Sequence, residues 1–486
     1  MNLYKKNAYE LSDMLKNKEI SSVELTNSVF DRIDAVENKV DAYTNLAKES
    51  ALKTAQDIDN KISSGENLHP LAGIPIGIKD NISTKGLKTT CSSKMLENYE
   101  PPFNATVIEK INNAGMVITG KLNMDEFAMG SSTENSFFKS TKNPHDLERI
   151  PGGSSGGSAA CVAAGEAIVS LGSDTGGSIR QPASYCGVVG LKPTYGSVSR
   201  FGLVAFASSL DQIGPCGKSV KDVAMLQSLI NGYDRMDATS SCREYTDIAS
   251  SLNGNIDGLK IGIPKEYFGD GIDANVKNSV MNAVKELENR GATVKSISLP
   301  STDCALSAYY IISSAEASSN LARFDGVKYG YRTENYDNLI DMYEKTRSEG
   351  FGDEVKRRIM LGTFVLSSGY YDAYYKRAKQ IQKRISSEFD SAFCDVDIIA
   401  TPTVPSTAFK IGENTDDPLK MYATDICTVT INIAGLPAIS IPCGKDDKNL
   451  PIGLQLIGNK FTEQNLLNTA YAYEKLVGGF AMPTIL

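Results

Sequence analysis

Residues 151–180 read P-G-G-S-S-G-G-S-A-A-C-V-A-A-G-E-A-I-V-S-L-G-S-D-T-G-G-S-I-R. Two serine- and glycine-rich segments, 151–158 and 173–180, stand on either side of a stretch made mostly of Ala, Val, Ile, Cys and Gly. A flexible Gly/Ser linker would be flanked by polar sequence instead. We therefore interpret the whole stretch as part of a folded core, with the two polar segments serving a site.

Short apolar runs outside this stretch predict the fold class. In residues 74–79, Ile alternates with Pro and Gly up to Lys79, which is typical of a short buried strand with a functional group at its end. Further strand candidates are 116–119, 168–171, 259–263, 397–400, 438–441 and 453–457. Because helix-patterned segments separate several of them, we expect an α/β fold with a mixed central β-sheet sandwiched by helices.

The domain organisation is expected to be simple. Ser21 and Glu24 make a capping-box pair before apolar residues at helical spacing, so residues 1–65 are expected to form an N-terminal helical layer. Residues 301–393 look helical and are expected to be an insertion over one end of the sheet. With no internal repeat and no clear linker, residues 1–486 are interpreted as a single domain.

Composition excludes several classes of protein. The 486 residues carry a net charge of −8, which supplies none of the positive field that free-standing nucleic-acid binders use. The nine cysteines include no C-x-x-C pair, so neither a zinc site nor a disulfide framework is expected. No apolar run reaches the length of a membrane span, and none follows the lysines of residues 1–10, so a signal peptide is not expected. We expect a cytoplasmic protein that binds no metal and no membrane.

Other chemistries that use glycine-rich turns fit poorly. The segment around Gly217, Lys218 and Ser219 lacks the spacing of a phosphate-binding loop, because position 212 is Gln. Gly152, Ser154 and Gly156 match the G-x-S-x-G elbow of α/β-hydrolases. In that fold, however, a histidine follows the serine, and both histidines of this chain precede Ser154. Glutamine hydrolysis by a cysteine nucleophile does not fit either, since residue 2 is Asn rather than Cys and no cysteine lies in a G-x-C-x-G elbow.

A lysine is the remaining candidate for a general base. Ser–Lys pairs are a known variant of triad chemistry, and Lys79 ends an apolar strand that favours its burial. To act as a base, a lysine must lower its pKa from about 10.4 to roughly 7 or 8, which requires about 4 kcal/mol. Burial can supply such a shift, although this segment alone equally allows a lysine that simply leaves the sheet for solvent.

Taken together, these segments resemble the amidase signature family along almost the whole chain. The matching motifs are L-A-G-I-P-I-G-I-K-D-N at 71–81, P-G-G-S-S-G-G-S-A-A at 151–160, D-T-G-G-S-I-R-Q-P-A at 174–183, G-L-K-P-T-Y-G at 190–196 and A-G-L-P-A-I-S-I-P at 434–442. The resemblance implies that Ser178 is the acylated nucleophile, Ser154 the bridging serine on a cis peptide bond and Lys79 the base. It assigns the oxyanion hole to the backbone N–H groups of Thr175, Gly176, Gly177 and Ser178. Asp174 and Arg180 are interpreted as scaffolding for the glycine turn.

Two further segments resemble one branch of the family, the glutamine-hydrolysing subunits of tRNA-dependent amidotransferases. They are K-L-N-M-D-E-F-A-M-G-S-S-T-E-N-S at 121–136 and R-F-G-L-V-A-F-A-S-S-L-D-Q-I-G-P at 200–215. For glutamine, the resemblance assigns Arg358 to the carboxylate, Asp425 to the amino group and Tyr309 to a supporting contact. Arg357 is a rival for the role of Arg358.

The same resemblance implies partners. It implies a large subunit that binds tRNA and amidates Glu or Asp on it with ATP and magnesium, and a small assembly subunit. This chain itself would need no cofactor. A stand-alone amidase of a small aliphatic or aryl amide is the alternative.

Overall fold

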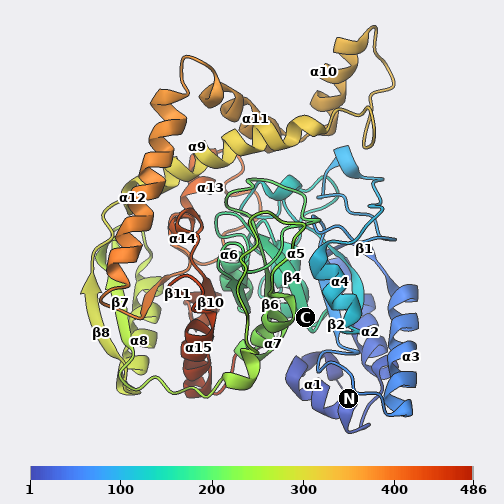
Figure 1. Cartoon of the computed structure of the whole chain (residues 1–486), viewed down its shortest axis with the longest axis vertical. Helices are drawn as coiled ribbons and strands as arrows, with labels where there is room; N and C mark the ends of the chain where they lie inside the picture. The colour runs from blue at the N-terminus through green and yellow to red at the C-terminus, as the bar shows by residue number, and fades with distance from the viewer. Residues whose placement is uncertain (1, 484–486) are drawn as a thin grey trace.

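One mixed sheet organises the computed structural model, which describes residues 2–483 (Figure 1). Its 11 strands run in the order β1-β3-β2-β4-β6-β5-β10-β11-β9-β7-β8. The strands are β1 Tyr43–Leu46, β2 Pro75–Lys79, β3 Val117–Leu122, β4 Val169–Asp174, β5 Val189–Lys192, β6 Gln212–Gly217, β7 Lys260–Pro264, β8 Thr293–Ile297, β9 Ile398–Pro402, β10 Ala438–Lys445 and β11 Pro451–Gly458. Parallel pairs, β3–β2–β4 on one side and β9–β7–β8 on the other, flank antiparallel pairs in the middle, and β1 adds an antiparallel edge strand beside β3. This mixed sheet confirms the expected α/β class.

Helices cover the sheet and extend above it (Figure 1). They are α1 Ala8–Lys16, α2 Ser22–Val40, α3 Lys48–Ser64, α4 Thr106–Asn113, α5 Gly156–Ala164, α6 Arg180–Cys186, α7 Val220–Ile230, α8 Ala274–Asn289, α9 Thr302–Asn320, α10 Leu339–Gly350, α11 Asp353–Leu366, α12 Arg377–Ala392, α13 Pro418–Ala423, α14 Val429–Ala434 and α15 Glu463–Val477. Within residues 2–483, every helix is too short or too polar to cross a lipid bilayer.

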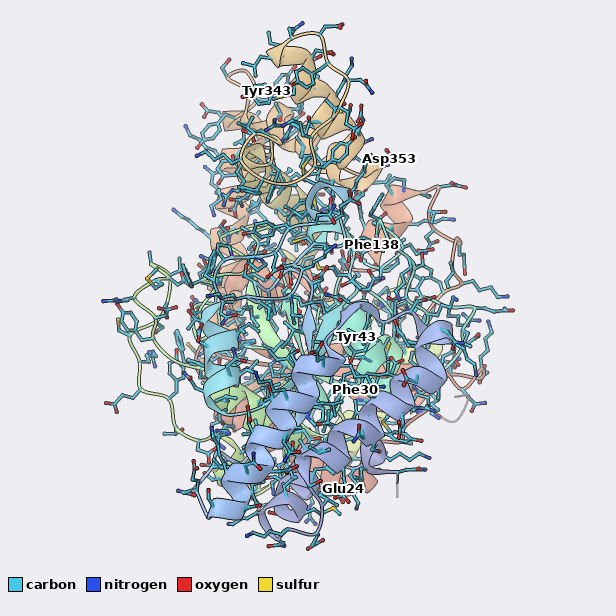
Figure 2. All side chains as sticks on the ribbon, turned by 90° about the vertical axis from the view of Figure 1, so that its right-hand side faces the viewer. Glu24, Phe30, Tyr43, Phe138, Tyr343 and Asp353 are labelled. Atoms are coloured by element: carbon cyan, nitrogen blue, oxygen red, sulfur yellow. The ribbon has the colours of Figure 1, made fainter. Side chains whose placement is uncertain are left out.

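The N-terminal helices begin where the capping pattern indicates. Ser21 Oγ accepts a hydrogen bond from the Glu24 N–H at 3.0 Å, and the Glu24 carboxylate accepts one from the Ser21 N–H at 2.8 Å. Figure 2 shows α2, which carries Phe30, and α3 in front of the sheet, with Tyr43 near them. The interpretation of residues 1–65 as purely helical is wrong at one place, because Tyr43–Leu46 forms the edge strand β1 against β3. The residues of β1, Y-T-N-L, contain no apolar run of the kind that predicts the other strands.

Three other strands escape the sequence patterns. β5 and β6 are interrupted by glycines, and the residues of β8 are mostly exposed or half-buried at the far edge of the sheet. All seven strands that the apolar runs predict are present within a few residues of the expected bounds. Apolar runs therefore predict seven of the strands, whereas strands that are interrupted by glycine or exposed at the edge of the sheet become visible only through their pairing.

The sheet places the site. β2 and β4 are parallel neighbours, with Ile78 opposite Leu171, so their carboxyl ends meet at one edge of the sheet. In α/β sheets this edge is where polar groups from successive strands converge. Helix α5 is buried on every side, which explains the apolar run after the first serine-rich segment. At the top of Figure 1, α9 and α11 extend over this part of the molecule.

Candidate active site

Lys79 is the last residue of β2, and its side chain is completely buried. Its Nζ lies 2.8 Å from Ser154 Oγ, 2.8 Å from Ser155 Oγ, 2.9 Å from Ser173 Oγ and 3.3 Å from the Ser173 carbonyl oxygen. Four uncharged oxygens therefore surround the amine, and no carboxylate of residues 2–483 forms an ion pair with it. This environment gives the charged form little compensation for the water it has lost.

Burial accordingly lowers the pKa of Lys79 to about 7, although Asp125, Asp174 and Asp211 in the surroundings act to raise it. A lysine with this pKa is substantially neutral at physiological pH. Its lone pair is then available to accept a proton, which is what a general base requires.

The sequence did not single out Ser155 and Ser173 as partners of this lysine. Ser155 Oγ donates to the Ser173 carbonyl oxygen at 2.9 Å and accepts the Ser173 N–H at 3.2 Å. Because a serine hydroxyl has one hydrogen, Ser155 can only accept from Lys79. A neutral lysine can therefore direct its N–H groups to Ser155 and Ser173 and its lone pair to the hydroxyl of Ser154. Both serines lie in the quoted segments, but spacing alone does not distinguish them from Ser154 and Ser178.

The peptide bond between Gly153 and Ser154 is cis, as the family resemblance implies. The Gly153 N–H donates to Gln181 Oε1 at 2.9 Å, and the Ser154 carbonyl oxygen accepts the Asp125 N–H at 3.3 Å. A Cβ on Gly153 would clash with the Asp125 carboxylate, so this turn requires glycine. These contacts hold the Ser154 hydroxyl toward Lys79.

Ser178 lies in the turn between β4 and α6 and remains 8% exposed. Its carbonyl oxygen accepts the Ser155 N–H at 3.1 Å, which ties the two serine-rich segments together. No hydrogen bond joins the Ser178 hydroxyl to Ser154 or to any other residue within 2–483. The hydroxyl is therefore free to meet a ligand, and the backbone bond to Ser155 holds its turn against the segment that bears Ser154.

Asp174 shapes the turn that bears Ser178. Its carboxylate accepts the Gly177 N–H at 2.8 Å and the Ile179 N–H at 3.1 Å. The assignment of Gly177 to the oxyanion hole is therefore corrected, because its N–H already donates to a carboxylate. The Thr175, Gly176 and Ser178 N–H groups make no hydrogen bond with other described residues. These three remain available to a developing oxyanion.

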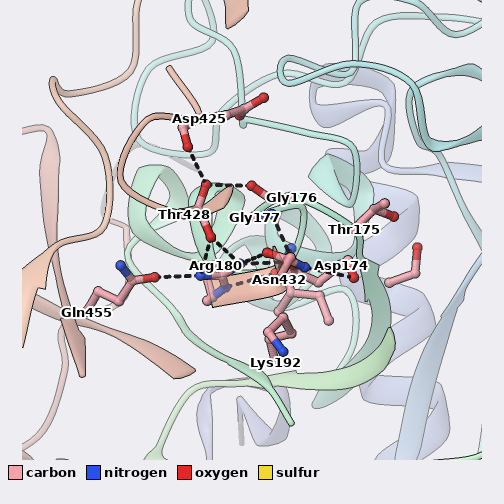
Figure 3. A network of polar contacts seen from close by, with 12 residues as sticks. Asp174, Thr175, Gly176, Gly177, Arg180, Lys192, Asp425, Thr428, Asn432 and Gln455 are labelled. Carbon is pink, nitrogen blue, oxygen red and sulfur yellow. Dashed lines mark hydrogen bonds and ion pairs between the residues drawn. The ribbon is translucent and has the colours of Figure 1, made fainter. Parts of the chain in front are cut away.

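A buried ion pair fixes Asp174 in turn (Figure 3). Arg180 Nη2 lies 3.0 Å from Asp174 Oδ1, and Nη1 donates to Gln455 Oε1 at 2.7 Å. Burial alone would raise the pKa of Asp174, but the adjacent Arg180 guanidinium outweighs it and holds that pKa well below its usual range. The interpretation of Asp174 and Arg180 as scaffolding for the glycine turn is confirmed by these bonds.

Charged groups of opposite sign line a neighbouring cavity of about 230 Å³, which includes Ser131, Glu354, Arg358 and Tyr422. The Arg358 guanidinium lies 4.5 Å from the ring centre of Tyr310 and 4.8 Å from that of Tyr422. Arg358 is 3% exposed, so it is a buried residue and not an ordinary surface arginine. Arg357 is much more exposed and pairs with Glu354.

Asp425 is buried beside Tyr310 and Ser131. It accepts hydrogen bonds from the Tyr310 hydroxyl at 2.8 Å and from the Ser131 hydroxyl at 3.0 Å. Burial raises the pKa of Asp425 to about 7, despite the opposing effects of these donors and Arg358. An ammonium group beside Asp425 would favour the ionised carboxylate.

Tyr309 lies against the glycine turn. A Cβ on Gly176 would come within 2.5 Å of the Tyr309 hydroxyl oxygen, so this ring covers the turn before Ser178. The hydroxyl that binds Asp425 belongs to Tyr310 instead. Adjacent tyrosines on a helix point in different directions, and the sequence does not decide which one faces a given group. Residues 2–483 contain no group of three or more His, Cys, Asp and Glu side chains that could hold a metal ion.

Comparison with known proteins agrees with this geometry. The family model described as Amidase matches residues 24–467. The chain is 59% identical over 98% of its length, and 98% of the relative's, to a protein from Carboxydothermus hydrogenoformans that is named as a glutamyl-tRNA(Gln) amidotransferase subunit. It is 60% identical to a protein of the same name from Clostridium botulinum, with 99% of each chain covered. The crystal structure of the Thermotoga maritima protein of that name is 44% identical, superposes with a TM-score of 0.83 and covers 100% of this chain and 98% of its own.

Proposed function

This chain belongs to the amidase family, and from that premise we propose that it is the glutamine-hydrolysing subunit of a tRNA-dependent amidotransferase. The observation that carries the proposal is the buried Lys79 Nζ, which lies 2.8 Å from Ser154 Oγ beside the turn that bears Ser178. Relatives close to 60% identical over nearly the whole chain are named as a subunit of glutamyl-tRNA(Gln) amidotransferase. The chain is thus an amidase component that releases ammonia for a partner to use.

In the proposed mechanism, Ser178 Oγ attacks the carbon of the glutamine side-chain amide. Its proton passes to Ser154 Oγ while the proton of Ser154 passes to the neutral Lys79, so the amine becomes an ammonium group. The negative charge that develops on the amide oxygen is stabilised by the N–H groups of Thr175, Gly176 and Ser178. Losing one such donor typically costs about 100- to 1,000-fold in rate.

The second half of the reaction reverses the relay. Lys79 returns its proton through Ser154 to the leaving nitrogen, which departs as ammonia and leaves a γ-glutamyl ester on Ser178. A water molecule, deprotonated by the same pair, then attacks the ester and releases glutamate. Both half-reactions use one base and one bridging serine, which is consistent with the lack of a histidine in the site.

Substrate recognition is proposed to use two side chains of opposite charge, Arg358 in the wall of the cavity and the buried Asp425. The planar fork of Arg358 suits a carboxylate, because its N–H groups can bind both oxygens. Asp425 in its ionised form pairs with the substrate ammonium, and Tyr309 covers the reacting amide from above Gly176. A free amino acid carries both charges, whereas a simple amide carries neither.

The word "subunit" in the names of the relatives supports at least one partner. We propose two: a large subunit that binds charged tRNA and activates its Glu or Asp with ATP and magnesium, and a small assembly subunit. This chain contributes no cofactor, and tRNA is held mainly by the large partner. A function of this kind belongs to the cytoplasm, where charged tRNA is used.

The test is ammonia release from glutamine by the purified chain, alone and with its partner subunits and charged tRNA. Hydrolysis of glutamine that the partners stimulate is the expected result. Rapid turnover of simple aliphatic or aryl amides by the isolated chain, with glutamine left intact, would overturn the proposal in favour of a stand-alone amidase.

A further inference from the structure

Glu354 lies at the centre of the contacts around Arg358, the positively charged side chain proposed to bind the substrate carboxylate. Its Oε1 accepts a hydrogen bond from Arg358 Nε at 2.6 Å and another from the Tyr422 hydroxyl at 2.8 Å. Its Oε2 pairs with Arg357. The carboxylate is 9% exposed, so these bonds form in a largely desolvated setting where charge-assisted bonds are strong.

The contact with Nε determines which edge of Arg358 a ligand can meet. Within residues 2–483, Glu354 is the one carboxylate that forms an ion pair with Arg358, and it does so at the inner nitrogen. The rings of Tyr310 and Tyr422 lie against the guanidinium and restrict its rotation. The edge formed by the two terminal nitrogens therefore has no carboxylate partner among the described residues and is presented to a ligand.

Glu354 also connects Arg358 to Asp425, the carboxylate proposed to bind the substrate ammonium. Tyr422, whose hydroxyl it binds, lies on α13, and the Tyr422 carbonyl oxygen accepts the Asp425 N–H at 3.1 Å. The chain of contacts thus runs from Arg358 through Glu354 and Tyr422 to the backbone of Asp425. Moving Glu354 would alter both the direction of the guanidinium and the separation of the two charges.

We propose that Glu354 is a positioning residue that makes the site specific for amides carrying a free α-carboxylate and a free α-amino group. It acts through Arg358 and Tyr422 and does not touch the reacting atoms. The charge of Glu354 also compensates that of the buried Arg358. This inference rests on the proposed function, because it assumes that Arg358 and Asp425 bind an amino-acid amide.

The experiment compares variants of the reconstituted amidotransferase in glutamine hydrolysis. Glu354→Ala is expected to raise KM for glutamine by about 10- to 100-fold, the effect of losing a charge-assisted bond, with kcat within about threefold of wild type. Glu354→Gln, which keeps an oxygen acceptor for Arg358 and Tyr422, is expected to recover most of the affinity. Lys356→Ala, on the same helix but in a solvent-exposed pair with Asp353, serves as the control and should leave both constants unchanged.

A double-mutant cycle separates a positioning role from a general structural one. Because Glu354 acts largely through Arg358, Glu354→Ala combined with Arg358→Ala should raise KM by clearly less than the product of the two single effects. Additive effects, an unchanged KM in Glu354→Ala, or equal losses of kcat and affinity with no recovery in Glu354→Gln would overturn the inference. If Arg358→Ala itself leaves KM unchanged, the assignment of the glutamine pocket fails instead. The thermal unfolding midpoint of each variant identifies one that is simply misfolded.

Discussion

Lys79 Nζ and Ser154 Oγ lie 2.8 Å apart in a buried site, and the lysine has no carboxylate partner among residues 2–483. Most buried lysines are paired with an acid, which keeps them charged. Lys121 illustrates the contrast on the neighbouring strand, where its Nζ lies 4.0 Å from the Asp80 carboxylate. The absence of such a pair at Lys79 favours a proton acceptor over a structural cation.

The pH dependence of glutamine hydrolysis follows from two pKa values. Lys79, with a pKa of about 7, acts only when it is neutral, and Asp425, also with a pKa of about 7, binds an ammonium only when it is ionised. Each group is in its active form when the pH is above its pKa, so kcat/KM should fall as the pH drops below 7. With two protons involved, the limiting slope should approach about two log units per pH unit. Asp425→Asn should reduce that slope to about one, as measured by steady-state ammonia release between pH 5 and pH 9.

Replacing Lys79 by Met should separate catalysis from folding. Met has a similar length and no charge to desolvate, so the thermal unfolding midpoint should stay the same or rise. Loss of the general base should lower kcat by at least about 1,000-fold. Lys79→Arg should be equally inactive, because a guanidinium stays protonated. Either variant with near-normal kcat would contradict the assignment of Lys79.

Gly176→Ala should disable the oxyanion turn. The added Cβ would clash with the Tyr309 ring, so the ring or the turn must move. We expect kcat/KM to fall by about 100-fold, the scale of one lost oxyanion donor. Gly369→Ala is the matched control, since a Cβ there meets nothing within 4 Å and its activity should be unchanged.

Asp174→Asn should act mainly on stability. Removing one member of a buried ion pair leaves Arg180 without its counter-charge, which typically costs about 3 to 5 kcal/mol. Because the folded-state pKa of Asp174 is lowered, its contribution is present above its unfolded-state pKa of about 3.9 and is lost as the pH falls below it. The difference in unfolding midpoint between wild type and variant should therefore be large at pH 7 and shrink below pH 4. An equal difference in unfolding midpoint at pH 7 and below pH 4 would contradict the ion-pair explanation.

The sequence predicted the parts of the site that depend on chain position. A strand that ends at Lys79 and two serine-rich turns near another strand are local patterns, and parallel neighbouring strands bring their ends together. The family resemblance added the roles of Ser154 and Ser178, which residue spacing alone did not supply.

Side-chain direction was harder to predict. The acceptors for Lys79 include Ser155 and Ser173 because of how two turns face each other across 18 residues, which no local pattern encodes. Helix rotation decides which of Tyr309 and Tyr310 faces Asp425, and Glu354 is recognisable only once Arg358 is known to be buried beside it. Tertiary contacts determine these features, and the expected availability of the Gly177 N–H was wrong for the same reason.

The most direct test of the mechanism is to trap the covalent intermediate. The protein is mixed with glutamine, quenched in acid within the first turnover and digested, and the peptides are analysed by mass spectrometry. We predict a glutamyl group on the peptide that contains Ser178, removable by hydroxylamine and absent from Ser178→Ala, while Lys79→Met forms it far more slowly. A glutamyl group on Ser154 or on any other residue, or normal ammonia release by Ser178→Ala, would contradict the account.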